Sequence, residues 1–362
     1  MDGCDSALPR RAIFAAGWLG LRPKAVSQCV SAAQRPPING ATFLCTAAVL
    51  LAAALRSNAD EPSLSPHGDT PQCELWLISS RQLGCHTAEL AAPMALQYRR
   101  SAAGCWERAA PEEFFADRSP PSTVIYVHGN RYTATDAVDI GSAFFRQFAA
   151  ASHAPLPQRF VIWSWPSEPI PGVHADLRKK ASVSDCHAHY LAQLIERIPA
   201  GVPVCMIGHS YGARLIAATL HLLAGAQIDG CALARFDVSS SERPLRAVMM
   251  AAAIDHDALL PGKRYEGALC AVELLLVLKN PLDPVLKRYP LLDRYRFPQA
   301  LGVAGMADPP SLCHDGEKLL EVDISNWIGR AHAWHRYVGS PSTLSLIRHA
   351  TEFEPAVSPV GR

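Results

Sequence analysis

Short, continuous apolar runs recur through the later part of the chain, separated by more polar stretches with helical periodicity. The runs are rich in Val, Ile, Leu and Met, which is typical of strands buried on both faces of a parallel sheet. They cover residues 122–129, 160–166, 203–208, 245–254, 271–278 and 318–324. Because helical stretches alternate with these runs, the pattern predicts an α/β fold with a doubly wound, mostly parallel sheet.

The segment before these runs has strand-like pieces of a different kind. Residues 73–80 and 94–100, followed by the stretch around Trp106, predict leading antiparallel strands and a connection. We therefore expect one α/β domain over residues 72–350, followed by a tail over residues 351–362.

The N-terminal residues 1–59 predict a disordered segment that ends in a signal peptide. The apolar run 41–55 is shorter than the roughly 20 residues that a membrane-spanning helix prefers. Basic residues precede it and small residues up to Ala59 follow it, as at a secretory cleavage site. Residues 60–71 predict a linker. We expect export to the periplasm or cell envelope, with a membrane anchor through residues 41–55 as the alternative.

Composition narrows the class of protein further. Apolar residues make up 49% of the chain and charged residues 19%, which is typical of a globular protein with a sizeable core. The net charge is +1 and basic residues form no long run, so a nucleic-acid partner is not expected. The 11 cysteines include no CxxC pair and no Cys/His spacing typical of zinc sites. We expect neither a metal nor a cofactor.

The strongest chemical motif is a Gly-x-Ser-x-Gly turn at residues 208–212. It lies between the apolar run 203–208 and a helical stretch rich in Ala and Leu. A serine on such a strand-to-helix turn is presented as a nucleophile above the sheet. Gly208 and Gly212 are expected to leave no room for a Cβ, because neighbouring chain passes close to the turn. The sequence therefore predicts Ser210 as a nucleophile.

A serine nucleophile needs a base, and the base needs an orienting acid. In this architecture the acid follows the serine along the chain, at the end of a late strand. Asp283 follows the apolar run 271–278 and is the expected acid, which would hold the histidine tautomer and stabilise its imidazolium. Asp255 and Asp257, after the run 245–254, are the alternatives.

The base is expected after the last apolar run, where the chain has two histidines. His335 begins the stretch HRYVGSP, which leads directly into a terminal helix predicted over residues 341–349. We favour His335 for this reason. His332 remains open as the base or as a second donor.

An oxyanion intermediate needs backbone donors that are already in place. One is predicted to be the N–H of Tyr211, directly after the nucleophile. The other is predicted in the loop after residues 122–129, as the N–H of Asn130, with Arg131 as the alternative.

Four other polar residues near these motifs have structural interpretations. His128 is expected to tie its loop through a hydrogen bond, and His209 to be a variable position of the turn. Lys179 and Lys180 are expected to mark a solvated helix face.

Five motifs together resemble those of the α/β-hydrolase superfamily. They are IYVHGN (125–130), WSWPS (163–167), IGHSYGARL (207–215), NPLD (280–283) and HRYVGSP (335–341). Residues 73–350 are similar to a bacterial family of uncharacterised α/β hydrolases. The resemblance implies Ser210, Asp283 and His335 as nucleophile, acid and base. The residues after His335 depart from the pattern of such families, which keeps His332 open.

The sequence thus predicts a serine hydrolase that cleaves an ester, or an amide or thioester, through an acyl-enzyme. The expected substrate is a small-molecule or lipid-like ester. The alternative is a catalytically inactive protein of the same fold that acts as a binding or scaffolding module of the envelope, because fold does not entail activity. A third interpretation, lipid acyl transfer at a membrane, depends on retention of residues 41–55.

Overall fold

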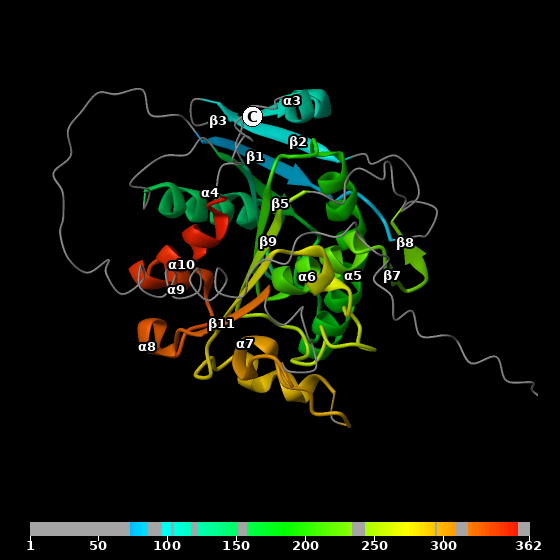
Figure 1. Cartoon of the computed structure of the whole chain (residues 1–362), viewed down its shortest axis with the longest axis vertical. Coiled ribbons are helices and arrows are strands. Elements are labelled where there is room, and N and C mark those ends of the chain that lie inside the picture. Colours follow the sequence, from blue (N-terminus) through cyan, green and yellow to red (C-terminus); the bar gives the residue numbers. More distant parts are fainter. Residues whose placement is uncertain are drawn as a thin grey trace, which may run out of the picture. The chain divides into compact units, whose positions relative to one another are not determined.

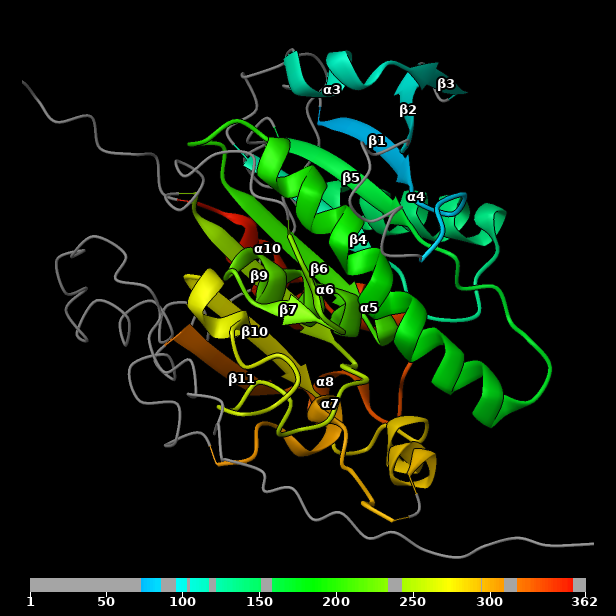
Figure 2. The ribbon, with the colours of Figure 1, turned by 90° about the vertical axis from the view of Figure 1, so that its right-hand side faces the viewer.

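A nine-stranded sheet organises the part of the chain that the computed structural model describes, namely residues 73–85, 96–102, 105–116, 122–150, 158–233, 243–293, 295–308 and 318–353. The strand order is β11-β10-β9-β6-β4-β5-β1-β2-β3 (Figures 1 and 2). These strands are β1 (Glu74–Ser79), β2 (Gln97–Ala102), β3 (Cys105–Ala109), β4 (Ser122–Val127), β5 (Gln158–Ser164), β6 (Val204–His209), β9 (Leu245–Met250), β10 (Leu274–Lys279) and β11 (Leu319–Asp323). Two short strands, β7 (Gln227–Ile228) and β8 (Cys231–Ala232), pair with each other.

Helices cover both faces of this sheet. The longer ones are α4 (Ala134–Ala150), α5 (Val173–Arg197), α6 (Tyr211–Leu223) and α10 (Pro341–Thr351). The short ones are α3 (Pro111–Ala116), η2 (Ala268–Ala271), η3 (Leu286–Leu292), α7 (Leu301–Ala304), α8 (Ser325–Ile328) and α9 (Trp334–Val338). Helices α5 and α6 lie on one face, whereas α4, α9 and α10 lie on the other (Figures 1 and 2). This is the doubly wound arrangement.

The strands from β1 through β5, β4, β6, β9 and β10 to β11 run parallel to one another. Every residue of β4 and of β6 is buried, which explains why their sequences are apolar without alternation. Because parallel strands end at the same edge of a sheet, the loops after β4, β6 and β10 lie along one edge. That edge carries the candidate functional residues.

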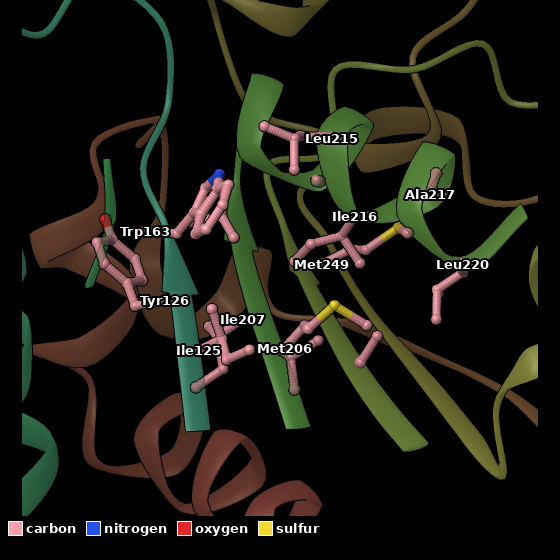
Figure 3. Close-up of a cluster of buried hydrophobic side chains, with 14 of the residues drawn as sticks. Ile125, Tyr126, Trp163, Met206, Ile207, Leu215, Ile216, Ala217, Leu220 and Met249 are labelled. Atoms are coloured by element: carbon pink, nitrogen blue, oxygen red, sulfur yellow. The ribbon is translucent and has the colours of Figure 1, made fainter. Parts of the chain in front are cut away.

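Helix α6 packs directly on the central strands. Its buried side chains include Leu215, Ile216 and Leu220, and the strands contribute Met206 and Met249 (Figure 3). Burying a side chain of this size stabilises a fold by roughly 1.5–3 kcal/mol. The strand and helix on either side of Ser210 are therefore both anchored in the core.

The leading strands match the prediction in part. β2 pairs antiparallel with β1 and with β3, as expected. β1 differs because it also pairs parallel with β5, with Trp76 opposite Val161. Its side chains Trp76 and Ile78 are buried, and Phe114 meets Trp76 edge-on at 5.2 Å, so β1 is an interior strand. The predicted α/β class, with a mostly parallel sheet and leading antiparallel strands, is confirmed.

The predictions for residues 1–59 and for the linker 60–71 lie outside the described residues, as does most of the predicted tail 351–362. Among the helices that the structure describes, none combines the length and the apolar character needed to cross a membrane.

Candidate active site

Ser210 lies at the turn between β6 and α6, with φ 55° and ψ −114°. A positive φ is strained for a residue with a Cβ, and such strain persists only where surrounding contacts impose it. Here the Ser210 N–H donates to the carbonyl oxygen of Met250 on β9 at 2.9 Å, and the Ser210 carbonyl accepts from the N–H of Ala213 at 3.1 Å. The turn therefore has the geometry that the motif predicts.

The two glycines of the motif are required by close packing. A Cβ at Gly212 would lie 2.1 Å from the carbonyl oxygen of Val127 on β4. A Cβ at Gly208 would lie 2.7 Å from the backbone of Gly212 and Ala213. The expectation that neither position has room for a side chain is confirmed.

Asp283 and His332 form a hydrogen-bonded pair at the same edge of the sheet. The His332 Nδ1 lies 2.7 Å from Asp283 Oδ2. Asp283 is fully buried, and its Oδ1 accepts from the N–H groups of Val285 at 2.8 Å and Leu286 at 3.0 Å. Because a carboxylate is an acceptor, we assign the imidazole proton to Nδ1, which leaves a lone pair on Nε2.

The loop that carries His332 is held by two side chains that the sequence analysis did not identify as functional. Buried Asn280 donates from Nδ2 to the carbonyl oxygens of Gly329 and Ala331, both at 2.9 Å. His209 donates from Nε2 to the carbonyl oxygen of His332 at 2.8 Å. Asn280 is the first residue of the NPLD motif, and His209 directly precedes Ser210. Their proximity to these motifs was the feature of the sequence that could have pointed to them.

The His209 ring is neutral, so the donating nitrogen carries its single ring proton. Burial lowers its pKa to about 3, and the nearby His332 lowers it as well. Because His209 directly precedes Ser210, this hydrogen bond ties the loop of His332 to the Ser210 turn.

His335, the histidine favoured from sequence, lies in α9, and its ring meets Trp334 edge-on at 5.9 Å. Among the described residues, the histidine that hydrogen-bonds the Asp283 side chain is His332. The contacts thus favour the alternative base. The preference for His335 followed the sequence of the terminal helix, whereas the backbone contacts of the loop 329–332 bring His332 to Asp283.

The alternative acids are engaged elsewhere. Asp255 accepts from the hydroxyl of Tyr289 at 2.9 Å and pairs with Arg296 at 3.3 Å. Asp257 pairs with Lys263 at 2.6 Å. Within the described ranges, neither carboxylate hydrogen-bonds a histidine ring.

The backbone N–H groups of Asn130 and Tyr211 have no hydrogen-bond acceptor among the described residues. The N–H of Arg131, the alternative donor, is already bound to the carbonyl oxygen of Ser167 at 2.7 Å. Buried Asp176 holds this loop, because its Oδ2 accepts from Asn130 Nδ2 and from the Arg131 guanidinium, each at 3.1 Å. Asn130 and Tyr211 are therefore the donors that remain available.

His128 holds the same loop through hydrogen bonds, as the sequence analysis expects. Its Nδ1 donates to the carbonyl oxygen of Gly129 at 2.9 Å, and its Nε2 accepts from the N–H of Trp165 at 3.3 Å. Burial lowers the pKa of His128 to about 3, so the ring is neutral. Both ring nitrogens are occupied, which leaves no role in proton transfer.

Within the described residues, one group has the residue types of a metal site. Potential ligand atoms of Cys85, Cys186 and His187 lie within 4.8 Å of one another. The two cysteines form a disulfide with their Cα atoms 5.7 Å apart. A disulfide offers no thiolate, and the thiolate is the form of cysteine that binds metals.

His332 also lines a surface cavity of about 400 Å³. Arg330 and Arg336 contribute to the same cavity, so it carries positive charge. A substrate that approaches His332 from this side would meet the loop 328–333.

No family model matches the chain, and no curated protein is similar to it. Among solved structures, an iodinated complex of acetyl xylan esterase aligns with a TM-score of 0.34 and 11% sequence identity. The alignment covers 65% of this chain and 100% of that one. A likeness of this degree carries no information about chemistry, which must follow from the residues of this chain.

Proposed function

We propose that this protein is a serine hydrolase that cleaves an ester through an acyl-enzyme intermediate. Ser210 is the nucleophile, His332 the general base and Asp283 the orienting acid. The observation that carries the proposal is the 2.7 Å hydrogen bond between His332 Nδ1 and Asp283 Oδ2, on the sheet edge that also carries the strained Ser210 turn.

In the proposed reaction, His332 Nε2 takes the proton from the Ser210 hydroxyl as its oxygen attacks the ester carbonyl carbon. Asp283 accepts the Nδ1 hydrogen bond and stabilises the imidazolium that forms. His332 then protonates the leaving alcohol, and a water molecule activated by the same ring releases the acid.

The backbone N–H groups of Asn130 and Tyr211 would stabilise the oxyanion. Their freedom from other acceptors supports this role. Donors of this kind contribute about 10²- to 10³-fold each to the rate. Asp176 and His128 position the loop of Asn130 and take no part in the chemistry.

His332 replaces His335 as the proposed base because a base must be oriented by a third group. His332 has that group in Asp283, and its backbone carbonyl is bound by His209. The expected substrate remains a small-molecule or lipid-like ester, and the two arginines of the cavity beside His332 favour one with a polar or anionic portion.

Labelling with a fluorophosphonate probe tests the proposal. We expect labelling of the folded protein that is abolished in Ser210→Ala and strongly slowed in His332→Gln. His335→Gln is the matched control and should label like the unmodified protein, because it removes a histidine three positions away.

Two results would contradict the proposal. Absence of labelling in the folded unmodified protein would reject a serine hydrolase and favour the non-catalytic binding module. Loss of labelling in His335→Gln with retention in His332→Gln would reassign the base.

A further inference from the structure

A second surface cavity of about 500 Å³ lies beside α5 and is called the α5 cavity below. Arg81, Lys179, Lys180 and His187 are its polar lining residues. Ser210 and His332 do not line it, so it is separate from the candidate active site. The Cys85–Cys186 disulfide joins the segment after β1 to α5 at this cavity.

Lys180 is the unusual residue of the α5 cavity. It is only 6% exposed, yet no hydrogen bond or ion pair to another described residue stabilises its ammonium group. Burial lowers the pKa of Lys180, although Asp176 and Glu168 oppose this effect from a distance. Burying most of a cationic side chain without an ionic partner is costly. The sequence interpretation of a solvated face fits exposed Lys179 and is wrong for Lys180.

The carboxylates nearest to Lys180 already have partners. Glu168 pairs with Arg81, which also donates to the carbonyl oxygens of Tyr132 and Thr133. Asp176 lies one turn before Lys180 on α5 and accepts hydrogen bonds from the loop of Asn130 through Oδ2 and from the N–H of Ile170 through Oδ1. Both carboxylates therefore hydrogen-bond other groups and act on Lys180 only from a distance.

His187 does not add an acidic or a cationic group. Its Nδ1 lies 2.9 Å from the hydroxyl of Ser80, and burial, then Arg81 and Lys180, lowers its pKa to about 3. The ring is neutral near pH 7. The lining of the cavity is thus positively charged. Lys179 and Lys180 provide this charge, because the charge of Arg81 is balanced by that of Glu168.

The rest of the lining is apolar and includes Leu83, Ile170 and Val183. Ligand sites typically enclose about 300–1,000 Å³ and combine an apolar wall with a few polar groups. We propose that the α5 cavity binds a carboxylate or phosphate carried on a short aliphatic chain, with Lys180 and Lys179 as the cationic partners of the anion.

The position of the cavity gives such a ligand a route to influence the active site. Arg81 lines the cavity and binds the carbonyl oxygens of Tyr132 and Thr133, in the loop that follows Asn130. Asp176, on the same helix face as Lys180, binds Asn130 itself. Arg81 therefore connects the cavity lining to the loop of the proposed oxyanion donor.

Titration calorimetry on Ser210→Ala protein tests the site without dependence on the proposed hydrolysis. The probes are hexanoate, hexyl phosphate and 1-hexanol, which share a chain and differ in the head group. We expect at least one anion to bind about tenfold or more tightly than hexanol, because an anion can form a charge-assisted hydrogen bond with the Lys180 ammonium. The stronger of the two anions identifies the head group.

A pair of variants locates the binding. Lys180→Met keeps the length of the side chain and removes the charge, and it should weaken binding of the anion by about tenfold to a hundredfold. Arg178→Met is the matched control, since Arg178 is exposed on the same helix and does not line the cavity, and among the described residues its side chain donates to the carbonyl oxygen of His174. It should leave binding unchanged.

The proposal is overturned if neither anion binds more tightly than hexanol. It is also overturned if Lys180→Met and Arg178→Met weaken binding equally, because the effect would then come from net charge. Neither outcome bears on Ser210, so failure of this site and failure of the proposed hydrolysis are distinguishable.

Discussion

The loop around Asp283 and the α5 cavity differ in how their buried polar groups are paired. At Asp283, both carboxylate oxygens, the Nδ1 of His332 and the amide of Asn280 have partners. At the α5 cavity, the side chain of Lys180 is largely buried, and its ammonium group has no hydrogen-bond or ion-pair partner among the described residues. Paired polar groups hold side chains in one geometry, whereas a cationic group without a partner can bind an anionic ligand.

The largest effect is expected from a substitution of Asp283, in the region of paired polar groups. Asp283→Asn keeps an oxygen that can accept from Val285 and Leu286 but no longer provides a carboxylate for His332. We expect kcat for a p-nitrophenyl ester to fall by about 10⁴-fold, because the histidine tautomer is no longer held. Thermal unfolding serves as the control for folding. A loss of less than about tenfold would argue against Asp283 as the orienting acid.

The pH dependence of stability sharpens the comparison, because both regions contain neutral buried histidines. Burial lowers the pKa of His128 and of His209 near the active site, and of His187 at the cavity, to about 3. In the unfolded chain a histidine has a pKa of about 6.5. Below that pH the unfolded state binds protons that the folded state does not, so stability is present above pH 6.5 and is lost as the pH falls.

The expected loss is up to about 1.4 kcal/mol of unfolding free energy per pH unit for each histidine. Urea unfolding at pH 7.5 and at pH 5.5 measures it, in a range where most carboxylates stay ionised. His187→Gln should reduce the slope by removing one of the three contributions. A flat profile would mean that these rings are not held neutral.

A smaller effect is expected at His209, which only positions His332, the proposed base. His209→Phe retains an aromatic ring and loses the hydrogen bond to the carbonyl oxygen of His332. We expect kcat to fall by about tenfold to a hundredfold with little change in KM, because the base is displaced from the nucleophile. A merely structural role would lower stability and leave kcat of the folded fraction unchanged.

The smallest effect is expected at Asp257, whose carboxylate pairs with Lys263. Asp257→Asn removes the ion pair with Lys263, which is partly exposed and contributes about 1 kcal/mol or less. Activity should stay near that of the unmodified protein. A large loss of kcat with retained folding would return Asp257 to the list of candidate acids.

Part of the candidate site could be predicted from local patterns. The Gly-x-Ser-x-Gly turn required Gly208 and Gly212, and a Cβ at either would meet backbone within 3 Å. Asp283 could be proposed because it follows a buried apolar run. The choice between His332 and His335 could not be made, since three residues of a loop separate them and no periodicity distinguishes them.

Other features depend on partners far along the chain. The Arg131 N–H is occupied by Ser167, and β1 lies parallel to β5, which begins more than 80 positions later. The helical pattern around Lys180 did not reveal its burial, because the other residues around the α5 cavity come mainly from the segment after β1 and from the loop after β5.

The sequence by itself determined the α/β class and the Ser210 turn, because apolar periodicity and the steric needs of glycine are local properties of the chain. Only the tertiary structure decided that His332 meets Asp283, that His209 and Asn280 hold its loop, and that Lys180 is buried without a partner. Those outcomes depend on where loops distant in sequence come together, and the packing of the sheet and its helices sets those positions.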